Sequence, residues 1–279
     1  MEIMLKDYLK ISEEDLNEYK LHLACWNGNE QPLNVYLQSW DKWVDWNEWR
    51  GGKDDFNRQY IFSLIQYHYE NGKWLFGGIF EIKKRYQDWI KTSIGYKTEL
   101  LDLHKDLIGR LVVDFYRYQG MRGRSFRLEN YYNEMKISEV FKSPFQGVSF
   151  PGYENIDIDF SDLEQLIKIQ KVDWKLLLEN VKGIYLIVDK SNGKKYVGSA
   201  YGDYGLWSRW STYINTGHGF NDELISLINA KGIEYARQNF KVSLFEHFPM
   251  KTDDNIVLKR ESFWKKAMLS KGEFGYNRN

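Results

Sequence analysis

The apolar positions of the first 160 residues predict a β-rich region with one short helix. Residues 59–86 indicate two strands around Asn71-Gly72, a dipeptide typical of tight hairpins. A further strand is expected over 108–116, a turn at Gly120, and a loop with short strands over 135–160. A helix face is predicted from four residues spaced three apart: Leu37, Trp40, Trp43 and Trp46.

The second part of the chain alternates between strand and helix patterns. Apolar spacing over 161–180 predicts one or two helices, and a new pattern begins at Val181. We expect strands over 183–188, 195–199 and 240–248, and helices over 205–213, 221–231 and 253–270. Asp253 or Asp254 is a predicted N-cap of the last helix.

These elements predict an α+β protein in three parts. Residues 1–160 are expected to form a β-rich domain for target recognition or an accessory role. Residues 161–180 are interpreted as a helical linker. Residues 181–279 are expected to form a small antiparallel three-stranded sheet flanked by helices.

Composition excludes several classes of protein. Aromatic residues make up 17% of the chain, which favours packed cores or stacking surfaces over disorder. The longest apolar runs, such as 184–188, are far shorter than the ~20 residues of a membrane span. No secretory signal is recognisable, and the single Cys25 can form neither an internal disulfide nor a cysteine-based zinc site. We therefore expect a cytoplasmic protein without membrane contact.

A zero net charge hides an uneven distribution. Residues 1–180 contain 24 basic and 29 acidic residues, whereas residues 181–279 contain 15 and 10, so the two parts carry −5 and +5. The C-terminal part is thus the candidate for phosphate contact. In the N-terminal part, four arginines interleaved with aromatic residues are typical of a strand pair with solvated arginines and are, as the alternative, candidate nucleic-acid contacts: Arg117, Arg122, Arg124 and Arg127.

A group of chemically capable side chains follows Val181. Tyr185 and Tyr196 lie on two strands that a Ser-Asn-Gly turn joins, and Arg209 and Tyr213 are four apart, on one helix face. Each of these residues alone is typical of a core or surface position. Their order, however, resembles the GIY-YIG nuclease family, with Gly183-Ile184-Tyr185 as the first motif and Tyr196-Val197-Gly198 as the second.

The resemblance covers about residues 181–279 and implies a phosphodiesterase site. Ten residues separate the two tyrosines, as is usual in the family; Val stands in the usual Ile place, and a tyrosine follows the arginine by four where some members have histidine. Glu261 matches the family's metal-binding glutamate, and Phe274-Gly275-Tyr276-Asn277 matches its terminal asparagine.

The resemblance implies a role for each of these residues. Tyr185 would be the base or orient water, Tyr196 and Arg209 would contact the scissile phosphate, and Tyr213 would support phosphate or water. Glu261 would be the one protein ligand of Mg²⁺ or Mn²⁺. The implied supporting residues are Gly183, Lys195, Gly198, His218 and Asn277.

Elementary chemistry is consistent with these roles. Magnesium binds through few carboxylates and keeps several waters, and the planar guanidinium of Arg209 suits phosphate oxygens. A tyrosine, with an ordinary pKa near ~10, can act as a base at neutral pH only if a metal ion, Arg209 or a lysine lowers its pKa. Lys195 is a candidate, although strand alternation predicts that it points away from Tyr196. His218, between two glycines, is interpreted as a loop residue able to approach phosphate.

The expected function is metal-dependent endonuclease activity on DNA, with RNA as another substrate. The strand-rich middle of residues 1–160 is similar to the small β-barrels of the PUA-like group, which often bind RNA or modified bases, so this part would choose the target. A non-catalytic nucleic-acid-binding module is the alternative. The protein could act as a monomer or, since one small site addresses one strand, as a homodimer.

Overall fold

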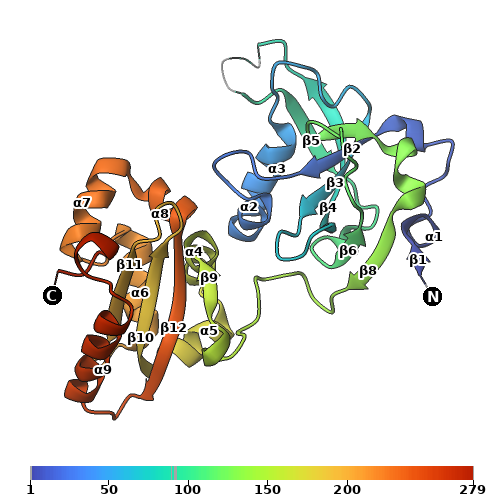
Figure 1. The fold of residues 1–279 in the computed structure, drawn as a ribbon. Coiled ribbons are helices and arrows are strands. Elements are labelled where there is room, and N and C mark those ends of the chain that lie inside the picture. Colours follow the sequence, from blue (N-terminus) through green and yellow to red (C-terminus); the bar gives the residue numbers. More distant parts are fainter. Residues whose placement is uncertain (1, 89, 91–92, 279) are drawn as a thin grey trace. The chain divides into compact units, whose positions relative to one another are not determined.

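The computed structural model describes residues 2–88, 90 and 93–278, which form two compact units, Met1–Gln146 and Gly147–Asn279 (Figure 1). The boundary differs from the expected one at 161–180. Residues 161–180 are not a linker, because Leu163, Trp174 and Leu178 are buried in the core of the second unit.

Unit 1 (Met1–Gln146) is built on a mixed sheet. Its strand order is β1-β8-β6-β4-β3-β2-β7, with β5 paired to β4; β2 and β3 are parallel, and the other pairs are antiparallel. The elements are β1 (Ile3–Met4), α1 (Leu5–Leu9), β2 (Tyr19–Ala24), α2 (Pro32–Gln38), α3 (Trp40–Glu48), β3 (Tyr60–Gln66), β4 (Lys73–Arg85), β5 (Tyr96–Leu100), β6 (Leu111–Asp114), β7 (Ser125–Arg127) and β8 (Lys136–Val140).

The sheet of unit 1 has an apolar core on each face. One core includes Phe62, Phe76 and Leu111, and the other includes Trp43, which α3 contributes, with Ile61 and Leu75 of the strands. The hairpin around Asn71-Gly72 is confirmed. The expected helix is found for Trp40, Trp43 and Trp46, which lie in α3, but Leu37 lies in α2, because the chain is extended at Ser39 between the two helices. In the described residues the sheet is an open path that ends at β1 and β7, so the expected PUA-like barrel is not confirmed.

Unit 2 (Gly147–Asn279) has a wholly antiparallel sheet in the order β11-β10-β12-β9. The elements are β9 (Asp157–Asp159), α4 (Phe160–Lys168), α5 (Val172–Leu178), β10 (Val181–Asp189), β11 (Lys195–Ala200), α6 (Gly205–Thr216), α7 (Asp222–Lys231), α8 (Ile233–Asn239), β12 (Phe240–Pro249) and α9 (Asp254–Ala267). The α+β class is confirmed, but the sheet has four strands instead of three, because β9 pairs with β12.

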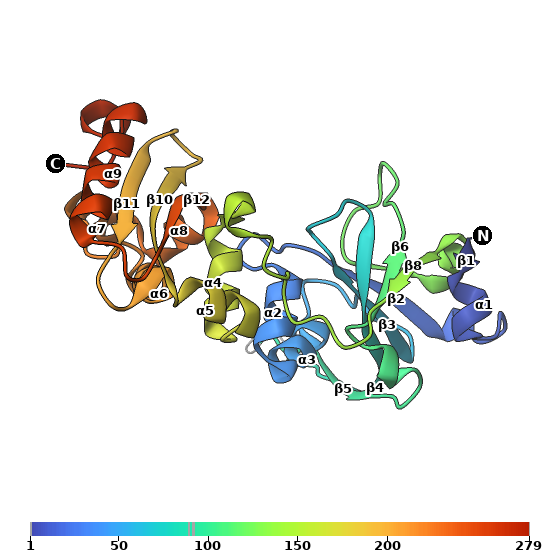
Figure 2. The ribbon, with the colours of Figure 1, turned by 90° about the horizontal axis from the view of Figure 1, so that it is seen from below.

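The helices of unit 2 cover both faces of this sheet. A large core that includes Tyr185 and Ile187 packs against α4, α5, α6 and α8, whereas Ile184, Leu186 and Val197 pack against Val257 of α9. This separation follows from strand alternation, which sends neighbouring side chains to opposite faces. Figure 2 shows α6 and α9 on the two sides of β10 and β11. No helix in the described part of the chain is long and apolar enough to cross a membrane.

Candidate active site

The two tyrosine motifs meet in the β10–β11 hairpin, as the sequence predicts. Tyr185 of β10 lies opposite Gly198 of the edge strand β11. A Cβ atom on Gly198 would lie 2.5 Å from the phenol oxygen of Tyr185 and 2.6 Å from its Cζ. The second motif therefore needs glycine here because the ring of Tyr185 crosses β11 at this point. Gly183 has a similar packing role, since a Cβ there would lie 2.8 Å from the Glu246 carbonyl.

Helix α6 brings Arg209 and Tyr213 to the same place. The Arg209 Nε–H donates to the Tyr185 hydroxyl at 3.0 Å, and an Nη2–H donates to the Tyr213 hydroxyl at 3.2 Å. The Tyr185 hydroxyl itself donates to the Tyr213 oxygen at 3.2 Å. Of the five donors of a guanidinium, these bonds use two. The described residues thus form a cluster of two phenols and one guanidinium whose other donors remain for a phosphate.

Burial determines the protonation state of this cluster. Tyr185 is fully buried and Tyr213 is 2% exposed, whereas Arg209 is partly exposed. Burial raises the pKa of each of the two phenols well above the ordinary value of a tyrosine. The nearby Arg209 cation lowers these pKa values, but by less than burial raises them. The condition for Tyr185 to act as a base at neutral pH is therefore not met by these residues. The Tyr185 hydroxyl accepts the Arg209 Nε–H, a contact that orients the guanidinium.

The second motif tyrosine also belongs to this face of the sheet. The Tyr196 ring is 6% exposed and lies 6.1 Å from the Tyr213 ring. Lys195 precedes it and, by alternation, faces the α9 side with its cross-strand partner Val188. The expected separation of Lys195 from Tyr196 is thus observed, and Lys195 is not placed to lower the pKa of the phenols.

The loop after α6 passes directly over Tyr213. Gly219 has a φ of +53°, and a Cβ there would lie 2.4 Å from the ring of Tyr213. His218 is part of this loop; its Nδ1 accepts the backbone N–H of Phe220 at 3.0 Å, and its ring packs against Phe220. The structure thus places His218 as a loop residue with local contacts.

The predicted metal ligand lies on the other side of β11. Glu261 of α9 accepts a hydrogen bond from the Ser199 hydroxyl at 2.7 Å and forms an ion pair with Lys265 at 2.8 Å. Its side chain is 12% exposed, so solvent still reaches it. Ser199 was missed by the sequence analysis; the signal that could have found it is its position directly after the glycine of the second motif.

The phenol–guanidinium cluster and Glu261 contact consecutive residues of the edge strand β11. Gly198 faces the phenol of Tyr185, and Ser199 holds the carboxylate of Glu261. Consecutive Cα atoms are ~3.8 Å apart. No hydrogen bond or ion pair among the described residues joins Glu261 to Arg209 directly. A ligand that spans the edge of β11 would therefore contact both.

The terminal segment holds this edge strand in position. The Asn277 side chain accepts the Val197 N–H at 2.9 Å and donates to the Val197 carbonyl at 2.8 Å. The Tyr276 N–H donates to the Lys195 carbonyl at 2.8 Å. The Asn277 side chain therefore extends the pairing of β11 by one residue.

The oxygen donors near Glu261 fit a hard divalent cation. A carboxylate and a neighbouring hydroxyl are the donor types that Mg²⁺ accepts, and magnesium completes its shell with water. No group of three or more His, Cys, Asp or Glu side chains able to hold a metal occurs in the described ranges. Any ion bound here would thus rest on Glu261, with Ser199 beside it.

The four arginines of unit 1 do not form one basic face. Arg117 donates to the carbonyls of Met121 and Gly123, both at 2.8 Å, and Arg124 lies 4.8 Å from the Trp49 ring and pairs with Asp55. These two side chains hold loops of the unit together. Only the other two, Arg122 and Arg127, are exposed.

Two solved structures are similar to about a third of the chain. No protein-family model and no curated protein matches the chain. The chain is similar to the catalytic domain of the homing endonuclease I-TevI, with 32% identity, over 35% of this chain and 98% of that structure. A point mutant of the catalytic domain of the intron endonuclease I-TevI matches with 29% identity over 36% and 94%. Both have a TM-score of 0.28.

Proposed function

We propose that unit 2 is a metal-dependent endonuclease of the GIY-YIG type that hydrolyses DNA phosphodiester bonds. The observation that carries the proposal is the contact of Arg209 with two buried phenols beside Gly198, next to the Ser199–Glu261 pair. A fixed guanidinium and a carboxylate near one strand edge are what a phosphodiester site needs: a cation for the phosphate and a ligand for a metal ion.

Each side chain has a definite task in this proposal. Arg209 binds phosphate oxygens and stabilises the charge that grows on them, because two neutral phenols hold its plane in one orientation. Tyr196, on the same face of the sheet, would contact the scissile phosphate together with Arg209. Glu261, with Ser199, would hold Mg²⁺ or Mn²⁺, which supplies an activated water and neutralises charge.

The first unit would choose the target in this proposal. A small site with one carboxylate has little surface for sequence recognition, whereas unit 1 carries exposed aromatic residues such as Trp26 and Trp49. Because Arg117 and Arg124 are engaged within the unit, such recognition would rest on bases more than on phosphates.

A plasmid-nicking assay tests the proposed activity. Supercoiled plasmid is incubated with Mg²⁺ and the wild type, Glu261→Ala or the matched control Glu273→Ala, an exposed glutamate of the same unit. Loss of a metal ligand removes several kcal/mol of stabilisation, so Glu261→Ala should nick about 10²–10³-fold more slowly, while the control is unchanged. Equal nicking by all three proteins contradicts the proposal.

The same assay separates the alternatives. Matched RNA replaces the plasmid in one arm, and preferential cleavage of RNA would change the substrate class. Salt-sensitive binding without cleavage under Mg²⁺ or Mn²⁺ would favour the non-catalytic binding module.

A further inference from the structure

The protein itself engages both oxygens of the candidate metal ligand. The Oε1 atom of Glu261 pairs with the Lys265 ammonium at 2.8 Å, and its Oε2 atom accepts the Ser199 hydroxyl at 2.7 Å. A divalent cation that binds this carboxylate must therefore share an oxygen with one of these two groups or displace it.

The two partners of Glu261 respond differently to a second cation. The Ser199 hydroxyl can keep its hydrogen bond to one oxygen while a metal ion takes the other, and its own oxygen is of a type that Mg²⁺ accepts. The Lys265 ammonium is repelled, because it carries a full positive charge next to the oxygen that the metal ion would use. Lys265 is therefore the group that has to leave.

The Glu261–Lys265 pair is enclosed enough for this competition to affect metal binding. The side chain of Glu261 is 12% exposed and that of Lys265 is 19% exposed, and salt screens partly buried charges less than exposed ones. The two residues are four apart on α9, a spacing at which Glu and Lys side chains meet. Because a largely buried carboxylate needs a partner to stay charged, Lys265 keeps Glu261 ionised while the metal ion is absent.

Other cations on this face of the sheet are engaged elsewhere or lie farther away. Lys182 and Arg260 form ion pairs with other acidic residues. Lys195 precedes Ser199 on β11 by four residues, which is about 13 Å along a strand. In the described ranges the carboxylate of Glu261 thus has one ion-pair partner.

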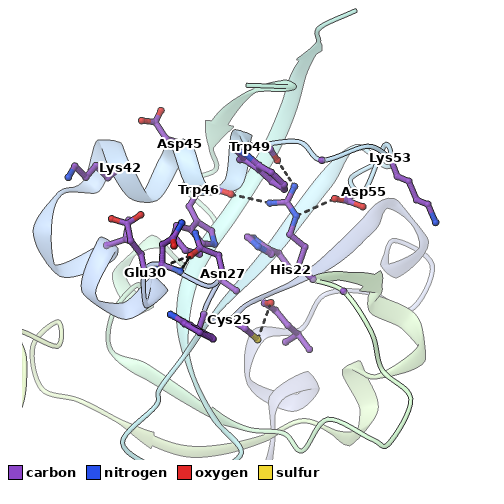
Figure 3. Close-up of a pocket in the computed structure, with 18 of the residues that line it drawn as sticks. His22, Cys25, Asn27, Glu30, Lys42, Asp45, Trp46, Trp49, Lys53 and Asp55 are labelled. Carbon is purple, nitrogen blue, oxygen red and sulfur yellow. Dashed lines mark hydrogen bonds and ion pairs between the residues drawn. The ribbon is translucent and has the colours of Figure 1, made fainter. Parts of the chain in front are cut away.

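A cation that is fixed by the protein has more contacts than Lys265 has. Arg124 lines a pocket of unit 1, where it pairs with a carboxylate and donates to two backbone carbonyls. Figure 3 shows the residues that hold it: Trp46, Trp49 and Asp55. The Lys265 ammonium, at the end of a flexible four-carbon stem, forms one ion pair within the part of the chain that the structure describes. Its displacement therefore breaks a single contact.

We propose that Lys265 is an internal counter-ion of Glu261 and that a divalent cation displaces it on binding. The inference rests on the metal role of Glu261 in the proposed function and adds a limit on metal uptake, because the ion binds with the affinity that remains after the exchange. Before the exchange the pair carries no net charge, so the unloaded edge of β11 does not repel a phosphate as a bare carboxylate would.

The test measures Mn²⁺ binding by the full-length protein without nucleic acid, from the EPR signal of the free ion. Lys265→Met keeps most of the stem and removes the charge, so it should bind Mn²⁺ about tenfold more tightly than the wild type. Lys265→Arg retains a cation and should show no gain. Lys266→Met, at an exposed lysine one residue further along α9, is the matched control and should change the affinity by no more than about twofold.

A second pair of variants connects the gain with the carboxylate. Glu261→Gln should weaken Mn²⁺ binding by at least about tenfold, and adding Lys265→Met to it should give no gain, because the two residues act through one contact. Thermal melting confirms that each variant is folded.

Three results would overturn the proposal. The first is an affinity of Lys265→Met for Mn²⁺ that is equal to or lower than that of the wild type. The second is an equal gain in Lys265→Met and in Lys265→Arg or Lys266→Met, which would show a general effect of the substitution or of net charge. The third is a gain that persists in the Glu261→Gln background.

The same measurements separate this inference from the proposed function. Equal Mn²⁺ binding by the wild type and Glu261→Gln would refute the metal role of Glu261, and the proposed function with it. Slower nicking by Glu261→Ala, together with equal Mn²⁺ affinities of the wild type and Lys265→Met, would refute the counter-ion alone.

Discussion

Tyr185→Phe tests the interpretation of the buried phenol as an anchor instead of a base. The variant removes one oxygen, which accepts from Arg209 at 3.0 Å and donates to Tyr213 at 3.2 Å, and leaves the ring in place. A hydrogen bond to a charged group contributes ~1.5–3 kcal/mol. If the bond only orients Arg209, the nicking rate should fall about 10–100-fold.

The assay is single-turnover plasmid nicking with Mg²⁺ across the neutral pH range. Because burial raises the pKa of Tyr185, the phenol stays protonated there, and the variant should lower the rate equally at every pH. Tyr204→Phe, at a tyrosine that is 78% exposed, is the matched control. A loss far larger than 100-fold, with a residual pH–rate profile that no longer has its acidic limb, would refute this reasoning and make Tyr185 the base.

Three further predictions follow from other contacts. Gly198→Ala places a Cβ 2.5 Å from the Tyr185 oxygen, so urea unfolding should show a destabilisation of ~1–3 kcal/mol. Because the Tyr185 phenol must move, nicking by the folded variant should also be slower than the loss of stability explains. Ser199→Ala removes the donor to Glu261, so a higher Mg²⁺ concentration should be needed for half-maximal nicking, and an unchanged requirement would contradict this role. Burial lowers the pKa of His22 to about 3, and the unfolded chain binds its proton near pH 6.5, so the free energy of unfolding should fall as pH drops from about 6.5 to about 3. That loss is at most roughly 5 kcal/mol, and unfolding curves of the wild type and of His22→Phe, whose free energy of unfolding should fall less over this pH range, measure it.

The local pattern predicted most of unit 2. Alternation and turn signals identified β10, β11 and β12, and helical spacing identified α6, α7 and α9 with its N-cap. In these segments the residues of the element itself are enough to show which face is apolar and where the element begins and ends. The strand β9 was missed because three residues carry almost no periodic signal, and its pairing with β12 is a distant contact. The boundary between the units was misplaced because residues 147–180 join unit 2 through contacts with residues that are distant in the sequence.

The candidate site was predictable in its members but not in its arrangement. The order of the motifs identified Tyr185, Arg209 and Glu261, yet the division of the site between the two faces of β11 depends on packing, as does the contact of Ser199 with Glu261. In unit 1, no local pattern distinguishes an arginine on a surface from one such as Arg124 that is enclosed by carbonyls and rings.

Paramagnetic broadening by Mn²⁺ tests most directly whether the carboxylate and the phenol–guanidinium cluster form one site. The full-length protein is labelled with fluorotyrosine, and the fluorine NMR signals of Tyr185 and Tyr213 are assigned by their phenylalanine variants. We predict that Mn²⁺ broadens both signals in the wild type and leaves them sharp in Glu261→Gln. Signals that stay sharp in the wild type, or that broaden equally in Glu261→Gln, would contradict the account.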